Sequence, residues 1–336
     1  MVDSKNKWKA WLYLSPALIL LAVFTVWPII NTVRLAFLQY YDDNGVLKPY
    51  SLMAELGMIK EYGSASFHIG LESFKQVLGY KDFGLTLLNT VLLCVLTVPV
   101  STLLALLIAV ALNSIKALNR LLQTIYFLPY VTNSIAIGMV FATMFNMVGS
   151  AIGLPGEKIA SVGLFNNFIG IFGIDPINWM TAAKHPPFEP YPGGVHPYWS
   201  NIFVMVVYIV WNALPFKILV LLGGLQSVNK QYYDAAKVDG TSKTRVFWRI
   251  TVPLLSPMIS YLLITGFIGG FKEYSSVVGV FGEDMNNDKL QTMVGYIYDN
   301  IGSNEGTASA AAIILFALIL VVTLINLKVS NKNTHY

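Results

Sequence analysis

Residues 86–112 read TLLNTVLLCVLTVPVSTLLALLIAVAL, an apolar run without a charged residue. A bilayer core needs about 20 apolar residues per helix, so this run is long enough to cross a membrane. Five further apolar blocks cover residues 12–36, 121–147, 200–225, 256–281 and 307–327. The six blocks predict an all-α polytopic membrane protein with six transmembrane helices.

The overall composition agrees with a membrane protein. Of the 336 residues, 55% are apolar and 12% are charged, and the mean hydropathy is +0.59. A soluble domain carries about 25% charged residues, so no soluble domain is expected. The polar residues gather in the stretches 37–85, 148–198 and 282–306. Cys94 is the single cysteine, which excludes an intrachain disulfide and a thiolate metal cluster.

The distribution of Lys and Arg predicts the orientation. Segments 1–10, 113–120, 226–253 and 328–336 hold 12 of these residues in 55 positions, whereas 37–84, 153–198 and 282–306 hold 7 in 119. Positive charge concentrates on the cytoplasmic side, so both termini are expected there. The domain organisation is then a cytoplasmic tail (1–11), a six-helix transmembrane domain (12–327) and a second cytoplasmic tail (328–336).

The N-terminal apolar run follows three lysines, as the run of a signal peptide does. It extends from Trp11 to about Phe37 and ends without a small-residue cleavage pattern. Because it is too long for a signal peptide, we expect it to be a retained first transmembrane helix.

The predicted cytoplasmic loop 226–253 contains two short helices. Lys230–Val238 has helical spacing, and Gly240 is placed to end it in a left-handed conformation. Ser242 can cap a second helix that runs to Ile250. Prolines at 253 and 257 then return the chain to the membrane. The sequence therefore predicts a helix-turn-helix on the cytoplasmic surface.

This loop resembles the EAA motif of permeases from binding-protein-dependent ABC importers. The motif is Glu-Ala-Ala, three residues, Gly, nine residues, then Ile-x-Leu-Pro, and the spacing here is the same throughout. Asp stands in place of the motif's Glu, and Val252 in place of its Leu. The matching residues are Asp234, Ala235, Ala236, Gly240, Ile250 and Pro253, joined by Asp239 and Phe247 of the extended form found in sugar permeases.

The resemblance implies a mechanism and a set of partners. In the family this loop sits in a cleft of an ATPase subunit, and ATP-driven closure of two ATPases switches a permease pair between inward- and outward-facing states. The expected partners are a second permease, two ATPase subunits, an extracytoplasmic solute-binding protein and membrane lipid, without nucleic acid. The chain has no Gly-x-x-x-x-Gly-Lys-Ser/Thr loop, so ATP-Mg is expected on the partner ATPases. No cofactor is expected on this chain.

Three further segments resemble the larger permease of maltose and glycerol-phosphate systems. They are Leu12-Tyr-Leu-Ser-Pro16, Leu88-Asn89-Thr90 and Phe127-Leu128-Pro129. A bacterial inner-membrane location and a sugar or oligosaccharide cargo follow as expectations from this resemblance.

The fourth and fifth apolar blocks carry the predicted cargo contacts. In maltose-type permeases these two spans build the sugar site, in which aromatic faces stack on sugars and amides or carboxylates bind hydroxyls. The residues here with that chemistry are Trp211, Asn212, Phe216, Glu273 and Tyr274. A charge inside a span costs about 2.5–3.5 kcal/mol, and Lys217 with Glu273 can alternatively form a buried structural pair. Lys272 can alternatively reach the membrane surface.

The outer stretch 185–199 is rich in proline and aromatic residues. It can form a docking surface for the binding protein or an irregular loop. His185, Glu189 and His196 do not follow a metal-binding spacing, so no metal site is expected.

The sequence also allows other functions. An ABC importer permease for glycerol phosphate, another polyol or an acidic sugar would carry the same loop. A secondary transporter would lack an ATPase, and an intramembrane enzyme would need a nucleophile with its base, or metal ligands, inside the spans. The apolar blocks contain no histidine.

Overall fold

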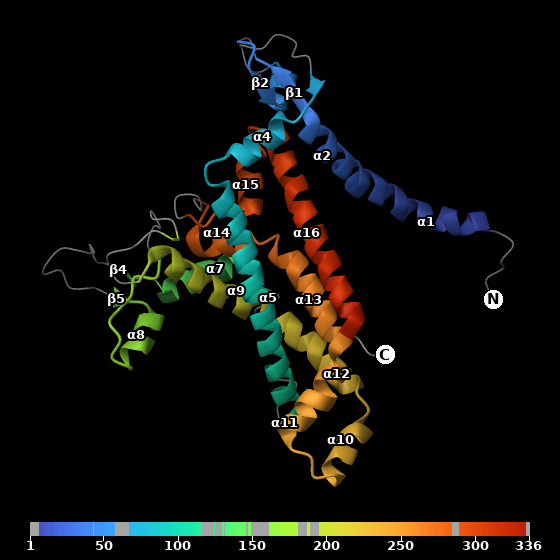
Figure 1. Ribbon diagram of the computed structural model, residues 1–336, viewed down its shortest axis with the longest axis vertical. Coiled ribbons are helices and arrows are strands. Elements are labelled where there is room, and N and C mark those ends of the chain that lie inside the picture. The colour runs from blue at the N-terminus through green and yellow to red at the C-terminus, as the bar shows by residue number, and fades with distance from the viewer. Residues whose placement is uncertain are drawn as a thin grey trace, which may run out of the picture. The chain divides into compact units, whose positions relative to one another are not determined.

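A computed structural model describes residues 7–42, 44–57, 67–115, 124, 130, 132–145, 147–148, 161–180, 187–188, 195–283 and 289–333. The chain divides into two compact units (Figure 1). Unit 1 contains residues 1–83 and 296–317, and unit 2 contains residues 84–295 and 318–336.

Unit 1 begins with a long apolar helix. It consists of α1 (Lys7–Leu21), a π-helical turn (Ala22–Val26) and α2 (Trp27–Phe37). Pro28 directly follows the π-helical turn inside this continuous helix, where it supplies no N–H to the backbone hydrogen bonds. The stretch Trp8–Phe37 is long and apolar enough to cross a membrane, and none of its most apolar window is buried. Such a helix requires lipid or another subunit around it.

The polar stretch after this helix folds into a small antiparallel sheet, an addition to the all-α prediction. β1 (Leu38–Tyr41) lies between β2 (Leu47–Pro49) and β3 (His68–Ile69), with Gln39 opposite Pro49 and Leu38 opposite Ile69. Asp42 closes the β1–β2 turn, because its carboxylate accepts hydrogen bonds from the backbone N–H groups of Asn44 and Val46. The helices α3 (Leu52–Glu55) and α4 (Glu72–Gly79) complete the stretch.

Tyr50 connects this small sheet to the start of α16 (Glu305–Asn333). Gly306 donates its N–H to the Tyr50 carbonyl at 2.9 Å, and Glu305 accepts from the N–H of Leu52. The Tyr50 hydroxyl donates to Glu55, and burial together with that carboxylate raises the pKa of Tyr50. An added Cβ at position 306 would lie 2.7 Å from the Tyr50 nitrogen, so glycine permits this close approach.

Unit 2 is built on the two longest apolar helices, α5 (Phe83–Ser114) and α9 (Pro197–Ser227). Both are longer than the predicted blocks 86–112 and 200–225, and both pass the length and hydropathy requirements for a membrane span. Pro99 and Pro215 lie inside these helices without ending them. Both helices therefore continue through their prolines.

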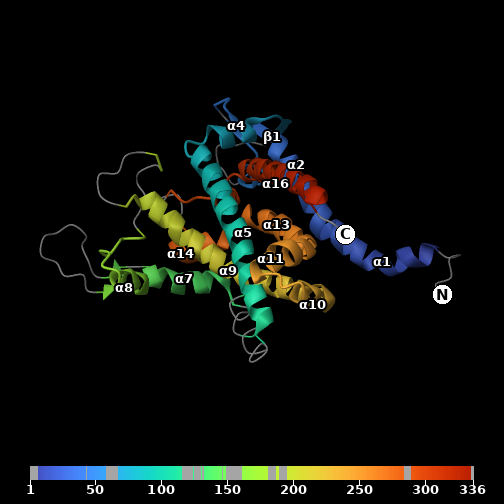
Figure 2. The ribbon, with the colours of Figure 1, turned by 60° about the horizontal axis from the view of Figure 1, so that its bottom comes forward.

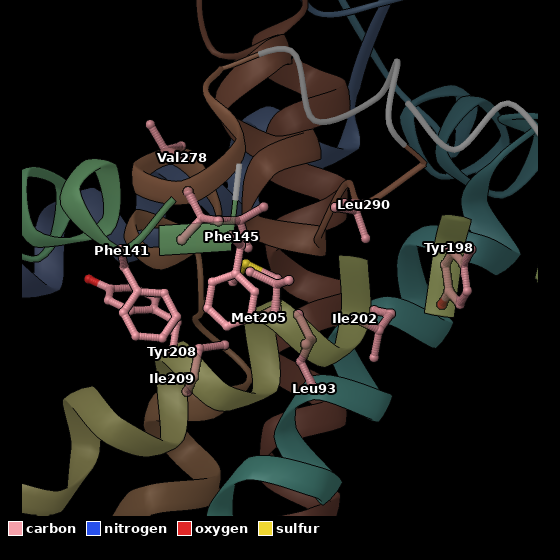
Figure 3. Packing of buried hydrophobic residues seen from close by; sticks show 13 residues of the cluster. Leu93, Phe141, Phe145, Tyr198, Ile202, Met205, Tyr208, Ile209, Val278 and Leu290 are labelled. Carbon is pink, nitrogen blue, oxygen red and sulfur yellow. The ribbon is translucent and has the colours of Figure 1, made fainter. Parts of the chain in front are cut away.

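An apolar cluster holds α5, α7 (Ser134–Phe145), α9 and α14 (Ser275–Phe281) together. Figure 3 shows the rings of Phe141 and Tyr208 turned toward each other, with Met205 and Phe145 beside them. The ring centroids of Phe141 and Tyr208 are 5.1 Å apart. Tyr208 and Met205 are fully buried, so the middle of α9 belongs to the packed interior rather than to a lipid-facing surface.

Glycines allow α7 and α14 to pack backbone against backbone. A Cβ added at Gly138 would lie 2.8 Å from the Cα of Gly279, and one at Gly279 would lie 3.0 Å from the Cα of Ile135. In Figure 2, α7 and α14 lie beside α9. Close helix pairs of this kind are typical of membrane proteins, because small residues let backbones approach.

The fifth predicted span, residues 256–281, is not one continuous helix, and this prediction is corrected. The structure has α13 (Ser256–Gly270), a break at residues 271–274, and the separate short helix α14. Helix α13 ends at Gly270, and Tyr274, which departs from helical geometry (φ −146°, ψ −55°), directly precedes α14. Before α13, the segment Lys243–Leu254 meets Ser256–Gly270 at an angle of 67°.

The remaining elements complete the two units. They are β4 (Met147–Val148), β5 (Ser161–Val162), α8 (Leu164–Gly170), α10 (Lys230–Val238), α11 (Lys243–Val246), α12 (Val252–Leu254) and α15 (Met293–Asn300). Residues 121–123, 125–129, 131 and 146 of the third predicted span lie outside the described residues. Over the described ranges, four helices are long and apolar enough to span a membrane, or five if the bent pair counts as one span.

The glycine contact between α7 and α14 gives a test of the fold. We expect Gly138→Ala to lower the free energy of unfolding by about 1–3 kcal/mol, because the added methyl would overlap backbone atoms that cannot move aside. Thermal unfolding in detergent, followed by labelling of the buried Cys94 thiol, measures the change. Gly269→Ala is the matched control, since an added Cβ there meets no atom within 4 Å. Equal melting temperatures for the two variants would contradict the packing.

Candidate coupling loop and transport site

The loop after α9 forms the predicted short helix and turn. Asn229 caps α10, because its side chain accepts a hydrogen bond from the N–H of Gln231 at 3.0 Å. Gly240 has φ +64°, the left-handed conformation expected there, and its N–H donates to the Lys237 carbonyl. Thr241 donates its N–H to Ala236, so the end of α10 is satisfied by the turn itself.

The second half of the loop packs against the ends of the long helices. Ser242 caps α11, which continues as a π-helical turn (Phe247–Thr251) into α12. Phe247 packs on a cluster that includes Leu112 of α5 and Leu225 of α9. Figure 1 shows α10 and α11 at the end of unit 2 where α5 terminates. The loop is therefore anchored on one side by apolar contacts.

The opposite side of α10 is open. Ala236 is buried, whereas Asp234 is exposed and lies 3.4 Å from the Lys237 ammonium group. Val238 is 88% exposed and Tyr232 is 55% exposed, an unusual pair of apolar side chains on a polar surface helix. Sequence reasoning missed both, although an apolar residue beside the Asp239-Gly240 turn was a signal that could have found Val238.

A cavity of about 410 Å³ lies inside the bend of the loop. Its lining is Asn229, Gln231, Tyr232, Ala235, Ala236, Asp239, Thr241 and Ile250. Four of the motif residues, Ala235, Ala236, Asp239 and Ile250, thus face one hollow. Pro253 is exposed at the start of α12.

Trp211 and Asn212 meet the start of α7. The Asn212 amide donates to the Ser134 hydroxyl at 3.2 Å, and Tyr208 donates to the Ser134 carbonyl at 2.5 Å. The rings of Trp211 and Phe141 lie 6.1 Å apart, and Trp211 is 38% exposed. Tyr208 and Ser134 join the predicted pair here, and neither was singled out from the sequence.

Phe216 lies one turn further along α9. Its ring stacks on Tyr130 with centroids 5.6 Å apart and an interplanar angle of 17°. The two rings form an aromatic pair on the same helix that carries Trp211, so α9 supplies all three predicted cargo residues of its block.

Glu273 and Tyr274 occupy the break between α13 and α14. The Glu273 carboxylate accepts a hydrogen bond from the N–H of Ser276 at 3.0 Å, which caps the first turn of α14. The Glu273 carbonyl accepts from the Thr292 hydroxyl at 2.9 Å. Tyr274 packs against the apolar cluster of α7 and α9. Both residues therefore have structural contacts in addition to any contact with cargo.

Lys217 does not form the buried ion pair with Glu273 that the sequence allowed, and this interpretation is corrected. Its buried ammonium group donates to the Ser101 hydroxyl at 2.6 Å, the Thr102 hydroxyl at 2.9 Å and the Val98 carbonyl at 3.1 Å. All three acceptors lie on α5. Lys217 thus joins α9 to α5, and its charge is enclosed by neutral groups.

The outer proline-rich stretch is described only in part. His185 and Glu189 lie outside the described residues. His196 caps α9, because its Nδ1 accepts from the N–H of Tyr198 at 3.2 Å, and the Trp199 indole donates to the Pro187 carbonyl at 3.1 Å. Over the described ranges, no three His, Cys, Asp or Glu side chains gather as metal ligands would.

Residues 98–334 match the family described as the inner membrane component of binding-protein-dependent transport systems. The chain belongs to this family. Its relatives are ABC importer permeases of the sugar type, as the EAA-like loop predicts. The recognition of the family from residues 234–253 is thereby confirmed.

Three curated relatives align with most of the chain. The arabinooligosaccharide permease AraP of Bacillus subtilis is 29% identical over 325 residues, covering 96% of this chain and 88% of that protein. The trehalose/maltose permease MalF of Thermococcus litoralis is 28% identical, covering 78% and 79%. The sn-glycerol-3-phosphate permease UgpA of Agrobacterium fabrum is 26% identical, covering 98% and 97%.

A solved structure shares the fold. It is a bacterial ABC transporter for import of the acidic polysaccharide alginate, with a TM-score of 0.71 and 20% identity, covering 99% of this chain and 98% of that chain. The likeness covers residues of both units and shows a shared, mostly helical fold.

The neutral surroundings of Lys217 predict opposite effects for two substitutions. We expect Lys217→Met to leave the melting temperature unchanged or raised, because it removes a buried charge and leaves no opposite charge behind. Ser101→Val should lower the free energy of unfolding by about 1–3 kcal/mol, because the ammonium loses its shortest hydrogen bond while still buried. Thermal unfolding of both variants in detergent is the measurement. A lower melting temperature for Lys217→Met than for Ser101→Val would show that the cation itself stabilises the fold.

Proposed function

We propose that this permease is one of two membrane subunits of an ATP-driven importer for a sugar or short oligosaccharide. An extracytoplasmic binding protein delivers the cargo, and separate ATPase subunits bind ATP-Mg and drive the transport cycle through the α10–α11 loop. The proposed topology has six membrane spans in a bacterial inner membrane. Both termini lie on the cytoplasmic side, as the distribution of Lys and Arg predicts.

The coupling loop is the observation that carries this proposal. Asp234, Ala235 and Ala236 lie on the capped helix α10, on which Ala236 is buried and Asp234 is exposed. Tyr232 and Val238 add two exposed apolar side chains to the same helix, and another protein can cover them. Asp234 and Val238 lie on α10 at i and i+4, so both can contact one partner. The ATPase subunit is that proposed partner.

The cargo class rests on α9 and on the break after α13. Trp211 and Phe216 offer aromatic faces, and Asn212 and Glu273 offer an amide and a carboxylate. This combination suits a ligand with apolar ring faces and many hydroxyls, which is the chemistry of a sugar. Relatives named for arabinooligosaccharide, trehalose/maltose and lactose transport support the same class.

An anionic cargo has weaker support. Relatives named for glycerol 3-phosphate and sulfoquinovosyl glycerol transport keep it as the alternative. The buried cation on α9, however, is held by α5 through three hydrogen bonds, and its charge is enclosed. Glu273 offers a carboxylate, which does not attract an anion, so the site residues themselves favour a neutral sugar.

The exposed tip of α10 predicts how the ATPase binds. We expect Val238→Asp to reduce co-purification of the ATPase subunit about tenfold or more, because a charge would replace an apolar contact at the centre of the interface. The measurement is a pull-down of the tagged permease from mild detergent with quantification of the ATPase. Ile69→Asp is the control, since Ile69 is 84% exposed on β3 in the predicted extracytoplasmic stretch. If no ATPase co-purifies even with the wild-type chain, a secondary transporter becomes the better account.

The two roles of Glu273 can be separated. Glu273→Gln keeps an oxygen that accepts from the N–H of Ser276, so we expect a melting temperature close to that of the wild type. Glu273→Ala should lower the free energy of unfolding by about 1 kcal/mol, because it removes the cap of α14. Uptake is measured with labelled maltose, arabinotriose, lactose and glycerol 3-phosphate in cells that express the complete importer. We expect Glu273→Gln to reduce uptake of the best-transported sugar, since a carboxylate binds hydroxyls more strongly than an amide. Unchanged uptake would limit Glu273 to the cap.

A further inference from the structure

Asn89 on α5 is a fully buried amide whose hydrogen bonds reach two distant parts of the chain. Its Nδ2 donates to the carbonyls of Lys289 and Gln291, each at 2.9 Å. Its Oδ1 accepts from the Tyr198 hydroxyl at 2.7 Å. Both amide protons and the amide oxygen are therefore satisfied inside the protein, far from water.

Neighbouring hydroxyl groups on α5 hold the same segment. Thr90 accepts a hydrogen bond from the N–H of Met293 at 2.9 Å, and Thr86 donates to the Gln291 side chain at 3.3 Å. All of these residues are at most 4% exposed. Residues 289–293 thus lie against α5 through backbone groups, and a substitution within the segment would leave most of these bonds intact.

The segment begins with a strained residue. Lys289 has φ +56°, and it is the only non-glycine residue with positive φ among those described. This conformation is unfavourable for a residue with a Cβ, because the Cβ crowds the following carbonyl oxygen. The carbonyl of that same residue accepts one of the two Asn89 hydrogen bonds, so the amide stabilises the strained turn.

Thr292 extends the connection to the predicted cargo residues. Its hydroxyl donates to the Glu273 carbonyl at 2.9 Å and accepts from the N–H of Gly295 at 3.2 Å. Glu273 in turn caps α14 through Ser276. A continuous chain of hydrogen bonds therefore runs from Asn89, through residues 289–293, to the break between α13 and α14.

We propose that Asn89 is a positioning residue for transport, which fixes the Glu273–Tyr274 turn through the strained segment 289–293. It does not touch cargo itself. The assignment of that turn to cargo binding rests on the proposed function, whereas the mechanical connection rests on the hydrogen bonds alone. Loss of the Asn89 amide should therefore loosen a turn 184 positions away in sequence, and impair cargo binding before ATP hydrolysis.

Hydrogen exchange of the purified permease complex in nanodiscs tests the connection. Asn89→Leu keeps a side chain of similar size and removes all three bonds. We expect amide exchange to rise about tenfold in peptides covering 289–296 and also in those covering 271–278. Adding Lys289→Gly removes the strain and should partly restore protection in both regions.

Two variants control for a general loss of stability. Thr97→Val removes a buried hydroxyl two turns along α5 that bonds only to its own helix, and should leave both regions protected. Tyr198→Phe removes only the hydrogen bond that the Asn89 oxygen accepts. The hydrogen bonds from the Asn89 amide to the carbonyls of Lys289 and Gln291 should remain. A rise in exchange throughout the protein, or a rise at 289–296 without one at 271–278, would overturn the proposal.

Uptake separates this proposal from the proposed function. With the best-transported sugar of the panel, Asn89→Leu should raise the apparent KM about 3- to 30-fold, with basal ATPase activity of the complex unchanged. A rise of exchange in both regions of Asn89→Leu, while the wild-type importer takes up no sugar of the panel, would uphold the connection between Asn89 and the Glu273–Tyr274 turn. That result would reject the assignment of the turn to sugar binding. Loss of basal ATPase activity in proportion to uptake would show a merely structural role and overturn the positioning assignment.

Discussion

The polar side chains of α5 satisfy the buried polar groups of unit 2 where water cannot. In an apolar surrounding, an unpaired donor or acceptor costs several kcal/mol. α5 carries hydroxyl and amide groups along its length, and they hold two separate elements: Asn89 and Thr90 bind residues 289–293, whereas Ser101 and Thr102 bind Lys217 of α9. These contacts hold residues 289–293 and α9 against α5.

Small residues then determine how closely the elements around α5 can pack. Gly138 and Gly279 bring α7 against α14, and Gly270 brings α13 against Cys94, where an added Cβ would lie 2.8 Å from the sulfur. These contacts place the break after α13 beside α7 and α9. Glu273 and Tyr274, two of the proposed cargo residues, therefore lie between helices that pack closely through glycines.

The coupling loop depends on different physics. It lies at an end of the long helices, and local devices shape it: a cap at Asn229, a left-handed glycine at 240 and a cap at Ser242. Apolar contacts of Phe247 fix it to α5 and α9. Movement of this loop by a partner would be passed directly to the helices that carry the hydroxyl contacts of Lys217 and the aromatic residues of α9.

The sequence alone determined the class of protein, the long apolar helices, the short helix 230–238 with its turn at Gly240, and the family, because hydrophobic periodicity, caps and motif spacing are local properties. It placed strands nowhere and read residues 256–281 as one helix, since apolar composition does not show where Tyr274 leaves helical geometry. Only the tertiary structure decided that Lys217 bonds α5 rather than Glu273, and that Asn89 holds residues 289–293. Those partners are more than 100 positions apart, and chain folding alone brings them together.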